Sequence, residues 1–197
     1  MVRTQGHLPQ EHRKKIRDRV ERERIATNIH TVVLEYMGHT HPEEMELMIG
    51  TVAAESGFTQ RIQMRGGPAR GIFQMEPRTA RDNYENYMKF PRWQYRYHEL
   101  MAVCFSLGSA PFFVPSDEDI EHLLIVNDTF SIIHARIKYL RDPEPIPADG
   151  RIKAIAEYYK RVYNTVKGKG SAEKFLEAWF HYDCASLCGM LKPYAKS

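Results

Sequence analysis

The chain has 197 residues, 43% of them hydrophobic and 27% charged, and carries a formal net charge of +3. This length suits one domain with a sizeable core, and the composition is typical of an ordinary globular protein. No apolar stretch is long enough to cross a bilayer, and the three cysteines are too few for a disulfide framework. The mildly basic balance favours approach to polyanions without identifying one.

The first predicted helix starts near residue 11 and continues to about residue 36. Acidic residues alternate with basic ones in its first half, EHRKKIRDRVERER, which favours a solvated, ion-paired face over a nucleic-acid-binding stripe. Gly38 can end this helix. We therefore expect residues 1–38 to form a charged N-terminal helix packed on a domain of residues 39–197, with no nucleic acid as partner. The face that packs on the domain should contain Ile16, Val20, Ile25, Ile29, Val32, Val33 and Tyr36, which recur at helical spacing.

A second helix has a clear start and a clear end. Thr40 can cap it, Pro42 suits its first turn, and Glu43 has the spacing of a capping box. The run MELMIGTVAAES is apolar on most sides, so we expect a buried, central helix. Gly57 is a natural stop, which places Glu55 in the last turn.

The rest of the chain is predicted to be helical between irregular segments. Residues 60–77 carry glycine, proline and arginine without helical period and predict a loop or a short irregular hairpin. Helices are expected from Arg78, over about 120–140, over 152–166, and after Ser171, which can cap the last one. Alternation of polar and apolar residues is nearly absent. The predicted fold class is therefore all-α, with at most a minor hairpin.

Glu55 is the first candidate for chemistry. Burial and the negative end of the helix dipole both favour the neutral form of a carboxyl group in the last turn of a buried helix. A carboxylic acid that keeps its proton near neutral pH can protonate the oxygen of a leaving sugar. On position alone, a Glu55 side chain that points to solvent is the more frequent outcome.

Two segments around this glutamate form a two-part motif. The first is AAESGF, with Glu55, Ser56 and Phe58, and the second is GPARGIFQMEPRTA, residues 67–80. In this order and at this spacing they resemble the signature of the lytic transglycosylase family related to goose-type lysozyme. The second part matches at Gly71, Ile72, Phe73, Gln74, Pro77, Thr79 and Ala80. The resemblance covers residues 45–168 and implies a lysozyme-like fold.

The resemblance also implies the roles of single residues. Glu55 would be the one catalytic acid and base, and Ser56 would orient either Glu55 or the muramoyl group. Gln74 would hydrogen-bond the neighbouring sugar, and Gly71 would shape the surface beneath that sugar. The family has a tyrosine beside its glutamate, within an Ala-x-Tyr-Asn segment, and AEYYKRVYNT fits that segment in two registers. We favour Tyr158, with Tyr163 and Asn164 as the second choice. The position of a family asparagine on an earlier helix holds Ile132 here.

The reaction implied is non-hydrolytic cleavage of the MurNAc-GlcNAc β-1,4 bond in peptidoglycan, with no cofactor and no metal ion. No second carboxylate stands out, although Glu76 and Asp82 are near in sequence. Alternatives are a hydrolytic, goose-type lysozyme, a non-catalytic virion structural protein that keeps the fold, and a nucleic-acid-binding helical protein.

Residues 1–23 have no apolar segment after their basic residues, so no secretory signal is expected. A missing secretory signal, together with a motif typical of cell-wall-degrading enzymes, favours a bacteriophage protein. We expect it in the virion, together with other virion proteins, or in the host cytoplasm before release, and acting on the cell wall in the periplasm.

Overall fold

The computed structural model describes residues 9–91, 99–104, 115–148, 150–164 and 170–189. Within these ranges the regular elements are helices, and extended pairing is limited to isolated bridges from Ile62 to Arg70 and from Arg70 to Met75. The all-α prediction is confirmed, and the bridges form the minor hairpin. No described helix combines the length and the hydrophobicity needed to span a membrane.

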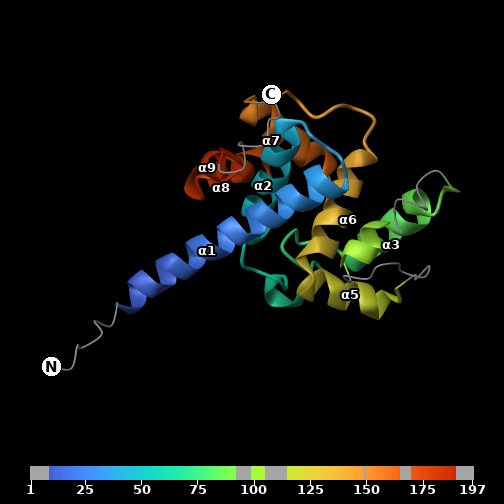
Figure 1. The fold of residues 1–197 in the computed structure, drawn as a ribbon, viewed down its shortest axis with the longest axis horizontal. Coiled ribbons are helices and arrows are strands. Elements are labelled where there is room, and N and C mark those ends of the chain that lie inside the picture. The colour runs from blue at the N-terminus through green and yellow to red at the C-terminus, as the bar shows by residue number, and fades with distance from the viewer. Residues whose placement is uncertain (1–8, 92–98, 105–114, 149, 165–169, 190–197) are drawn as a thin grey trace.

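Helix α2, Pro42–Ser56, lies at the centre of the molecule (Figure 1). It packs against α7, Ile152–Val162, α8, Ala172–His181, and α9, Cys184–Gly189. Most of its residues are buried because both the Leu47 and the Val52 sides of the helix are covered by neighbours. The expected buried central helix is therefore present.

A second group of helices lies on the other side of α2. Helix α6, Asp128–Leu140, packs against α5, Asp117–Val126, and α3, Pro77–Asn83, contacts both. A buried hydrogen bond of 2.7 Å between Thr51 Oγ1 and Tyr139 Oη ties α2 to α6. The irregular segment 57–76 connects the end of α2 to α3.

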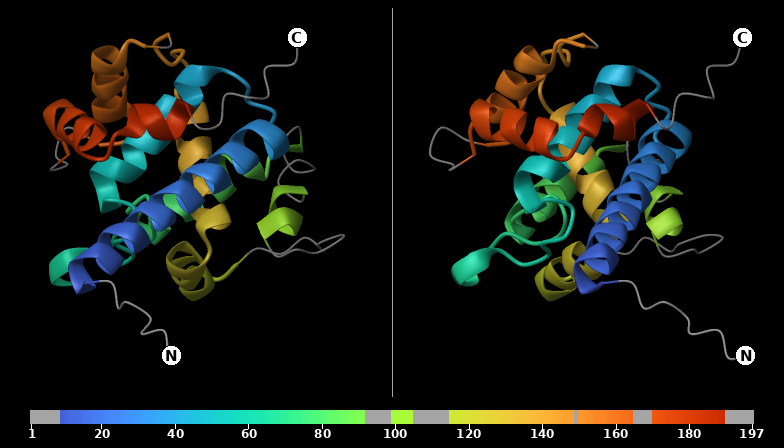
Figure 2. Two further views of the ribbon diagram at one scale, coloured as in Figure 1. Left: turned by 60° about the vertical axis from the view of Figure 1, so that its left-hand side comes forward. Right: turned by 90° about the vertical axis from the view of Figure 1, so that its left-hand side faces the viewer.

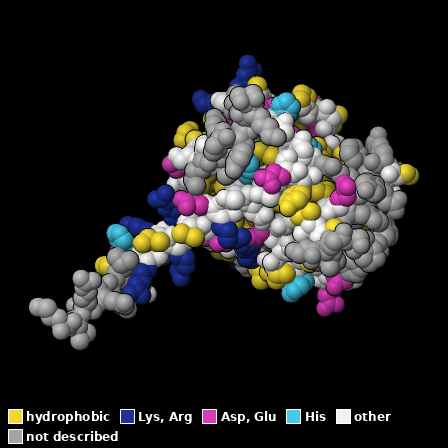
Figure 3. All heavy atoms as spheres, viewed as in Figure 1, with side chains coloured by type: hydrophobic (Ala, Val, Ile, Leu, Met, Phe, Trp, Pro, Cys, Tyr) yellow, Lys and Arg dark blue, Asp and Glu magenta, His cyan; other side chains and the backbone are white. Residues whose placement is uncertain are grey.

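Helix α1, Gln10–His30, crosses the outside of both groups and continues as a π-helical segment, Thr31–Tyr36 (Figures 1 and 2). Its first half projects from the body, and Lys and Arg side chains follow it (Figure 3). The predicted apolar face is wrong there, since Ile16 is 48% and Val20 57% exposed. Its second half enters the core through Ile25 and Ile29, and the π-helical segment does so through Val32 and Val33. Tyr36, also expected on this face, is 44% exposed.

Two expected helix boundaries differ from the structure. Glu44, not Glu43, completes the first turn of α2, where its Oε2 accepts a 3.2 Å hydrogen bond from His41 N; Thr40 lies outside the helix. The helix expected over 120–140 is two helices, because Asn127 is extended and its Oδ1 accepts a 3.0 Å bond from Phe130 N, which starts α6.

The last two helices follow the sequence more closely. Helix α7 ends at Val162, and residues 165 and 166, to which it was expected to extend, lie outside the described residues. Helix α8 begins as predicted, with Ser171 Oγ accepting a 3.1 Å hydrogen bond from Lys174 N.

Candidate active site

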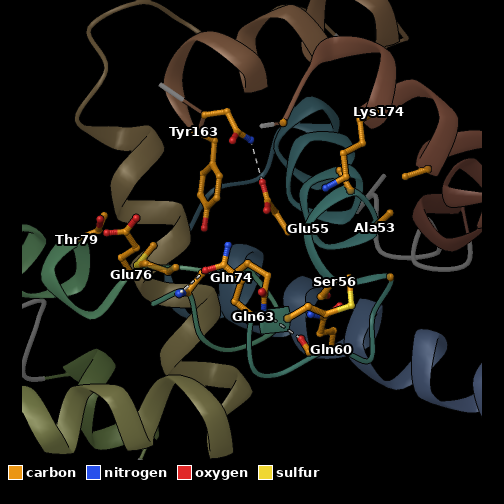
Figure 4. A pocket seen from close by; sticks show the side chains of 18 of the residues that line it. Ala53, Glu55, Ser56, Gln60, Gln63, Gln74, Glu76, Thr79, Tyr163 and Lys174 are labelled. Carbon is orange, nitrogen blue, oxygen red and sulfur yellow. Dashed lines mark hydrogen bonds between the residues drawn. The ribbon is translucent and has the colours of Figure 1, made fainter. Parts of the chain in front are cut away.

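A long groove opens between the two groups of helices, with the 57–76 segment as its floor. Its volume is about 1320 Å³. The end of α2, the start of α3, the end of α6, the segment after α7 and one face of α8 all contribute to its walls. Figure 4 shows Glu55, Gln74, Tyr163 and Lys174 around the same opening. The end of α2 and the segments around α7 and α8, which lie about a hundred residues apart in the sequence, therefore meet here.

Glu55 lies in the middle of this groove, and two side chains hold one of its oxygens. Tyr159 Oη donates a hydrogen bond to Glu55 Oε1 at 2.6 Å, and Asn164 Nδ2 donates to the same atom at 2.9 Å. Asn164 Nδ2 also donates to Tyr159 Oη at 2.6 Å, which closes a three-membered network. No described residue donates to Oε2. The carboxyl group is thus fixed in orientation through one oxygen, and the other is available to a ligand.

Tyr159 acts as a neutral donor in this network. Burial raises its pKa far above the ordinary value for tyrosine, and the charge of the Glu55 carboxylate raises it further. The hydroxyl therefore keeps its proton over the whole physiological pH range. Its ring is fully buried and packs on Tyr163 and Phe175, with centroids 6.1 and 5.0 Å away.

Tyr163 forms part of the groove wall and ties it to the floor. Its hydroxyl donates to Phe73 O at 2.9 Å, so that the end of α7 is anchored on the predicted motif. Lys138 Nζ donates to Tyr163 O at 2.7 Å and lies 4.1 Å from the centre of the Tyr163 ring. Burial lowers the pKa of Lys138, while the charges of Glu55 and Glu76 oppose that shift.

Gln74 presents an acceptor to the groove. Its Nε2 donates to Gly71 O at 2.9 Å and to Gln60 O at 3.3 Å, which engages both amide hydrogens. The Oε1 atom, for which no described donor is present, is left for a ligand. Gln74 holds a left-handed backbone, with φ of 44°, and this conformation aims the side chain into the opening (Figure 4).

The chain matches no protein-family model, no curated protein and no solved structure. The chemistry of the site therefore rests on the side chains that line it. Among the described residues, no three His, Cys, Asp or Glu side chains are grouped so that they could hold a metal ion.

The remaining predicted site residues have structural partners. Ser56 lines the groove, but its Oγ donates to Val52 O at 3.1 Å and the residue is only 7% exposed. Gly71 is not part of the lining. Its φ is 73°, and a Cβ there would lie 2.2 Å from Leu124 O, so glycine allows α5 to approach the loop and its carbonyl supports Gln74.

Tyr158, the tyrosine preferred from the sequence, lies away from Glu55. Its hydroxyl donates to Glu144 O at 3.3 Å, and its ring stacks on Tyr139 with centroids 6.0 Å apart. The structure corrects the preferred register, because Asn164 and Tyr163 reach the groove instead. Tyr159, which the sequence reasoning missed, is one helical turn before Tyr163 on the same face of α7. That spacing is the signal that could have found it.

Glu76 and Asp82, the two other carboxylates considered from the sequence, are not placed like Glu55. Glu76 lines the groove, but Arg78 Nε lies 2.5 Å from its Oε2 in an ion pair. Asp82 is not part of the lining and pairs with Arg141 and Asn86. Among the described residues, Glu55 is the groove carboxylate that two neutral donors hold and that forms no ion pair.

Proposed function

We propose that the chain is a peptidoglycan lytic transglycosylase that cleaves the MurNAc-GlcNAc β-1,4 bond, with Glu55 as its single acid and base. The observation that carries the proposal is the geometry of Glu55, which lies in an open groove with Oε1 held by Tyr159 and Asn164 and Oε2 free. The substrate class comes from the resemblance of residues 55–58 and 71–80 to the family motif. A lysozyme-like arrangement of the helices is part of the same proposal.

The first step would be a proton transfer. Glu55 Oε2 gives its proton to the glycosidic oxygen, the bond from that oxygen to C1 of the muramoyl sugar breaks, and the GlcNAc side leaves as an alcohol. The carbonyl oxygen of the muramoyl N-acetyl group stabilises the electron-poor C1. Tyr159 and Asn164 donate to the carboxylate that remains, and Gln74 Oε1 can accept a hydrogen bond from the sugar's N–H or hydroxyl.

The second step would return the proton. The Glu55 carboxylate accepts the proton of the sugar's primary hydroxyl at C6, and that oxygen bonds to C1 to close a 1,6-anhydro ring. No water enters the product. Most hydrolytic glycosidases use a second carboxylate, so the products decide between this mechanism and hydrolysis.

A non-catalytic virion protein with the same fold is the main rival. A filled groove, or an ion pair between Glu55 and an arginine such as Arg70, would support this rival. The groove is open, and Arg70 pairs with Glu121 at 2.7 Å. Both observations support the catalytic proposal. The bacteriophage origin, and action on the cell wall from the virion or after release, are proposed with it.

The deciding experiment is digestion of purified peptidoglycan followed by mass spectrometry of the products. We expect 1,6-anhydromuramoyl ends, which are lighter by one water than the reducing ends of a hydrolase. Glu55→Gln should keep the fold and abolish cleavage, because the amide cannot donate the acid proton. Reducing ends as the main product would replace the mechanism by hydrolysis, and absence of cleavage by the folded wild-type chain would contradict the enzyme proposal.

A further inference from the structure

The groove continues beyond Glu55 along helix α8. Lys174, Glu177, Ala178 and His181 line it, and their spacing places them on one face of α8. The turn at Met64 and Arg65, which belongs to the 57–76 floor, lines the same groove. We call this part of the groove, between Arg65 and α8, the α8 arm. It lies outside the group of residues that surrounds the Glu55 carboxylate.

Charges are balanced at one end of the groove but not in the α8 arm. At the α3 end, Arg78 is paired with Glu76 at 2.5 Å. In the α8 arm, neither Arg65 nor Lys174 forms an ion pair with any carboxylate of the described chain. Glu177 contributes one negative charge to the same face of α8, so the two cations leave an excess of positive charge.

The backbone that presents these two cations is ordered by local contacts. Arg65 has a left-handed backbone, with a φ of 60°, in the turn Met64–Gly66. Lys174 lies in the first turn of α8, which the 3.1 Å bond from its backbone N to Ser171 Oγ fixes. Figure 4 shows the Lys174 side chain extending from α8 toward the opening that contains Glu55. Arg65 and Lys174 therefore both line the groove that contains Glu55.

Sugar hydroxyls and N-acetyl groups are neutral and are satisfied by neutral donors and acceptors. Lysine and arginine instead form charge-assisted hydrogen bonds with carboxylates. We propose that the α8 arm binds the carboxylates of a peptide stem carried by the glycan, so that the preferred substrate is a peptide-bearing strand. This inference rests on the proposed function, because it takes the substrate in the groove to be peptidoglycan.

The test measures binding by isothermal titration calorimetry, on protein carrying Glu55→Gln, so that no substrate is consumed. Two muramoyl tetrasaccharides are compared, one with tetrapeptide stems and one in which each stem is replaced by an uncharged N-methylamide on the lactyl group. We expect the stem-bearing ligand to bind about tenfold more tightly, as one or two charge-assisted contacts would give. Adding Arg65→Ala and Lys174→Ala should bring the ratio of the two affinities close to one.

Two further variants separate charge from structure. Arg65→Lys with Lys174→Arg keeps both charges and should keep most of the preference. Lys153→Ala removes an exposed lysine on α7, outside the groove, and should leave the ratio unchanged. Circular dichroism on every variant verifies that the fold is retained.

The inference is overturned if both ligands bind equally well, or if the double alanine variant keeps the preference. It is also overturned if that variant weakens both ligands by the same factor, since the arm would then contact the sugars alone. Failure of the proposed function would be seen separately, as absence of any cleavage of peptidoglycan by the wild-type chain.

Discussion

At the scale of single residues, the neighbours of Glu55 determine how its carboxyl group is held. Tyr159 and Asn164 both donate to Oε1, and Asn164 also donates to Tyr159. Each donor therefore holds the other in place as well as the carboxylate. Such supporting contacts fix the orientation of a functional side chain.

Tyr159→Phe tests this network. The change removes one hydrogen bond to a carboxylate, worth about 1.5 kcal/mol, so the rate of glycan cleavage should fall roughly tenfold. The matched control is Tyr158→Phe, which removes only the bond to Glu144 O and should stay within about twofold of the wild-type rate. Rates are measured on defined glycan strands. A larger loss in the control than in Tyr159→Phe would return the active-site role to Tyr158.

His134 is a second residue whose environment has a measurable consequence. It is fully buried in α6, with its ring 4.3 Å from that of Phe130, and neither ring nitrogen has a hydrogen-bond partner among the described residues. Burial lowers the pKa of His134 to about 3 from an ordinary value of 6.5. Between these two pH values the unfolded chain binds a proton that the folded chain does not. The free energy of unfolding therefore falls as the pH falls through this window.

His134→Leu should remove this contribution. Between pH 7 and pH 5 the wild-type chain should lose about 2 kcal/mol of stability through this group, which corresponds to one proton taken up on unfolding. Urea unfolding of both proteins at the two pH values measures the difference. If the variant loses as much stability as the wild type, His134 is not the group responsible.

At the scale of elements, a part-buried ion-pair network joins three distant segments. Asp128, at the start of α6, accepts from Arg24 of α1 at 2.6 Å and from Arg61 of the groove floor at 3.2 Å. Glu21 of α1 also contacts Arg61, at 3.3 Å. The Asp128 side chain is only 8% exposed, and both arginines donate to it. The network connects α1 to the loop that follows Glu55.

Asp128→Asn should therefore be costly. Neutralising this carboxylate leaves the part-buried Arg61 with Glu21 as its remaining counter-charge, and we expect a loss of about 2 kcal/mol in the free energy of unfolding. Asp82→Asn provides the comparison, because its pair with Arg141 is 45% and 30% exposed and should contribute less than about 1 kcal/mol. Guanidinium unfolding curves give both values, and equal losses would contradict the assignment.

At the scale of the whole molecule, α1 divides into two parts with different roles. Residues 10–15 are exposed and project from the body, whereas Ile25, Ala26 and Ile29 are in the core. The first part therefore contributes little apolar burial. The second part covers α2 and α6 and is part of the folded domain.

Two truncations separate these parts. Removal of residues 1–15 should change the free energy of unfolding by less than about 1 kcal/mol, since the described residues it removes bury no apolar side chain. Removal of residues 1–30 deletes Ile25, Ala26 and Ile29, and should cost about 5 kcal/mol or more, enough to abolish a cooperative transition. Thermal unfolding followed by circular dichroism measures both. A stable protein without residues 1–30 would make α1 a dispensable extension.

The sequence by itself determined the helical class, the buried helix that ends at Gly57, the capped start of α8, and the position of Glu55 in a last helical turn. These features follow from side-chain spacing and capping residues only a few positions apart, so a short window of sequence contains the physical cause. The irregular 57–76 segment follows from its glycines and proline in the same way.

Only the tertiary structure decided which tyrosine meets Glu55 and that the arm along α8 belongs to the same groove. Tyr158 and Tyr159 are adjacent, equally apolar and both buried, so local pattern does not distinguish them. The choice depends on the rotation of α7 against α2 and α6, which the packing of Tyr139 and Tyr163 sets. Likewise, Asp128 lies 67 residues after Arg61, and the two meet only because the helices between them pack together.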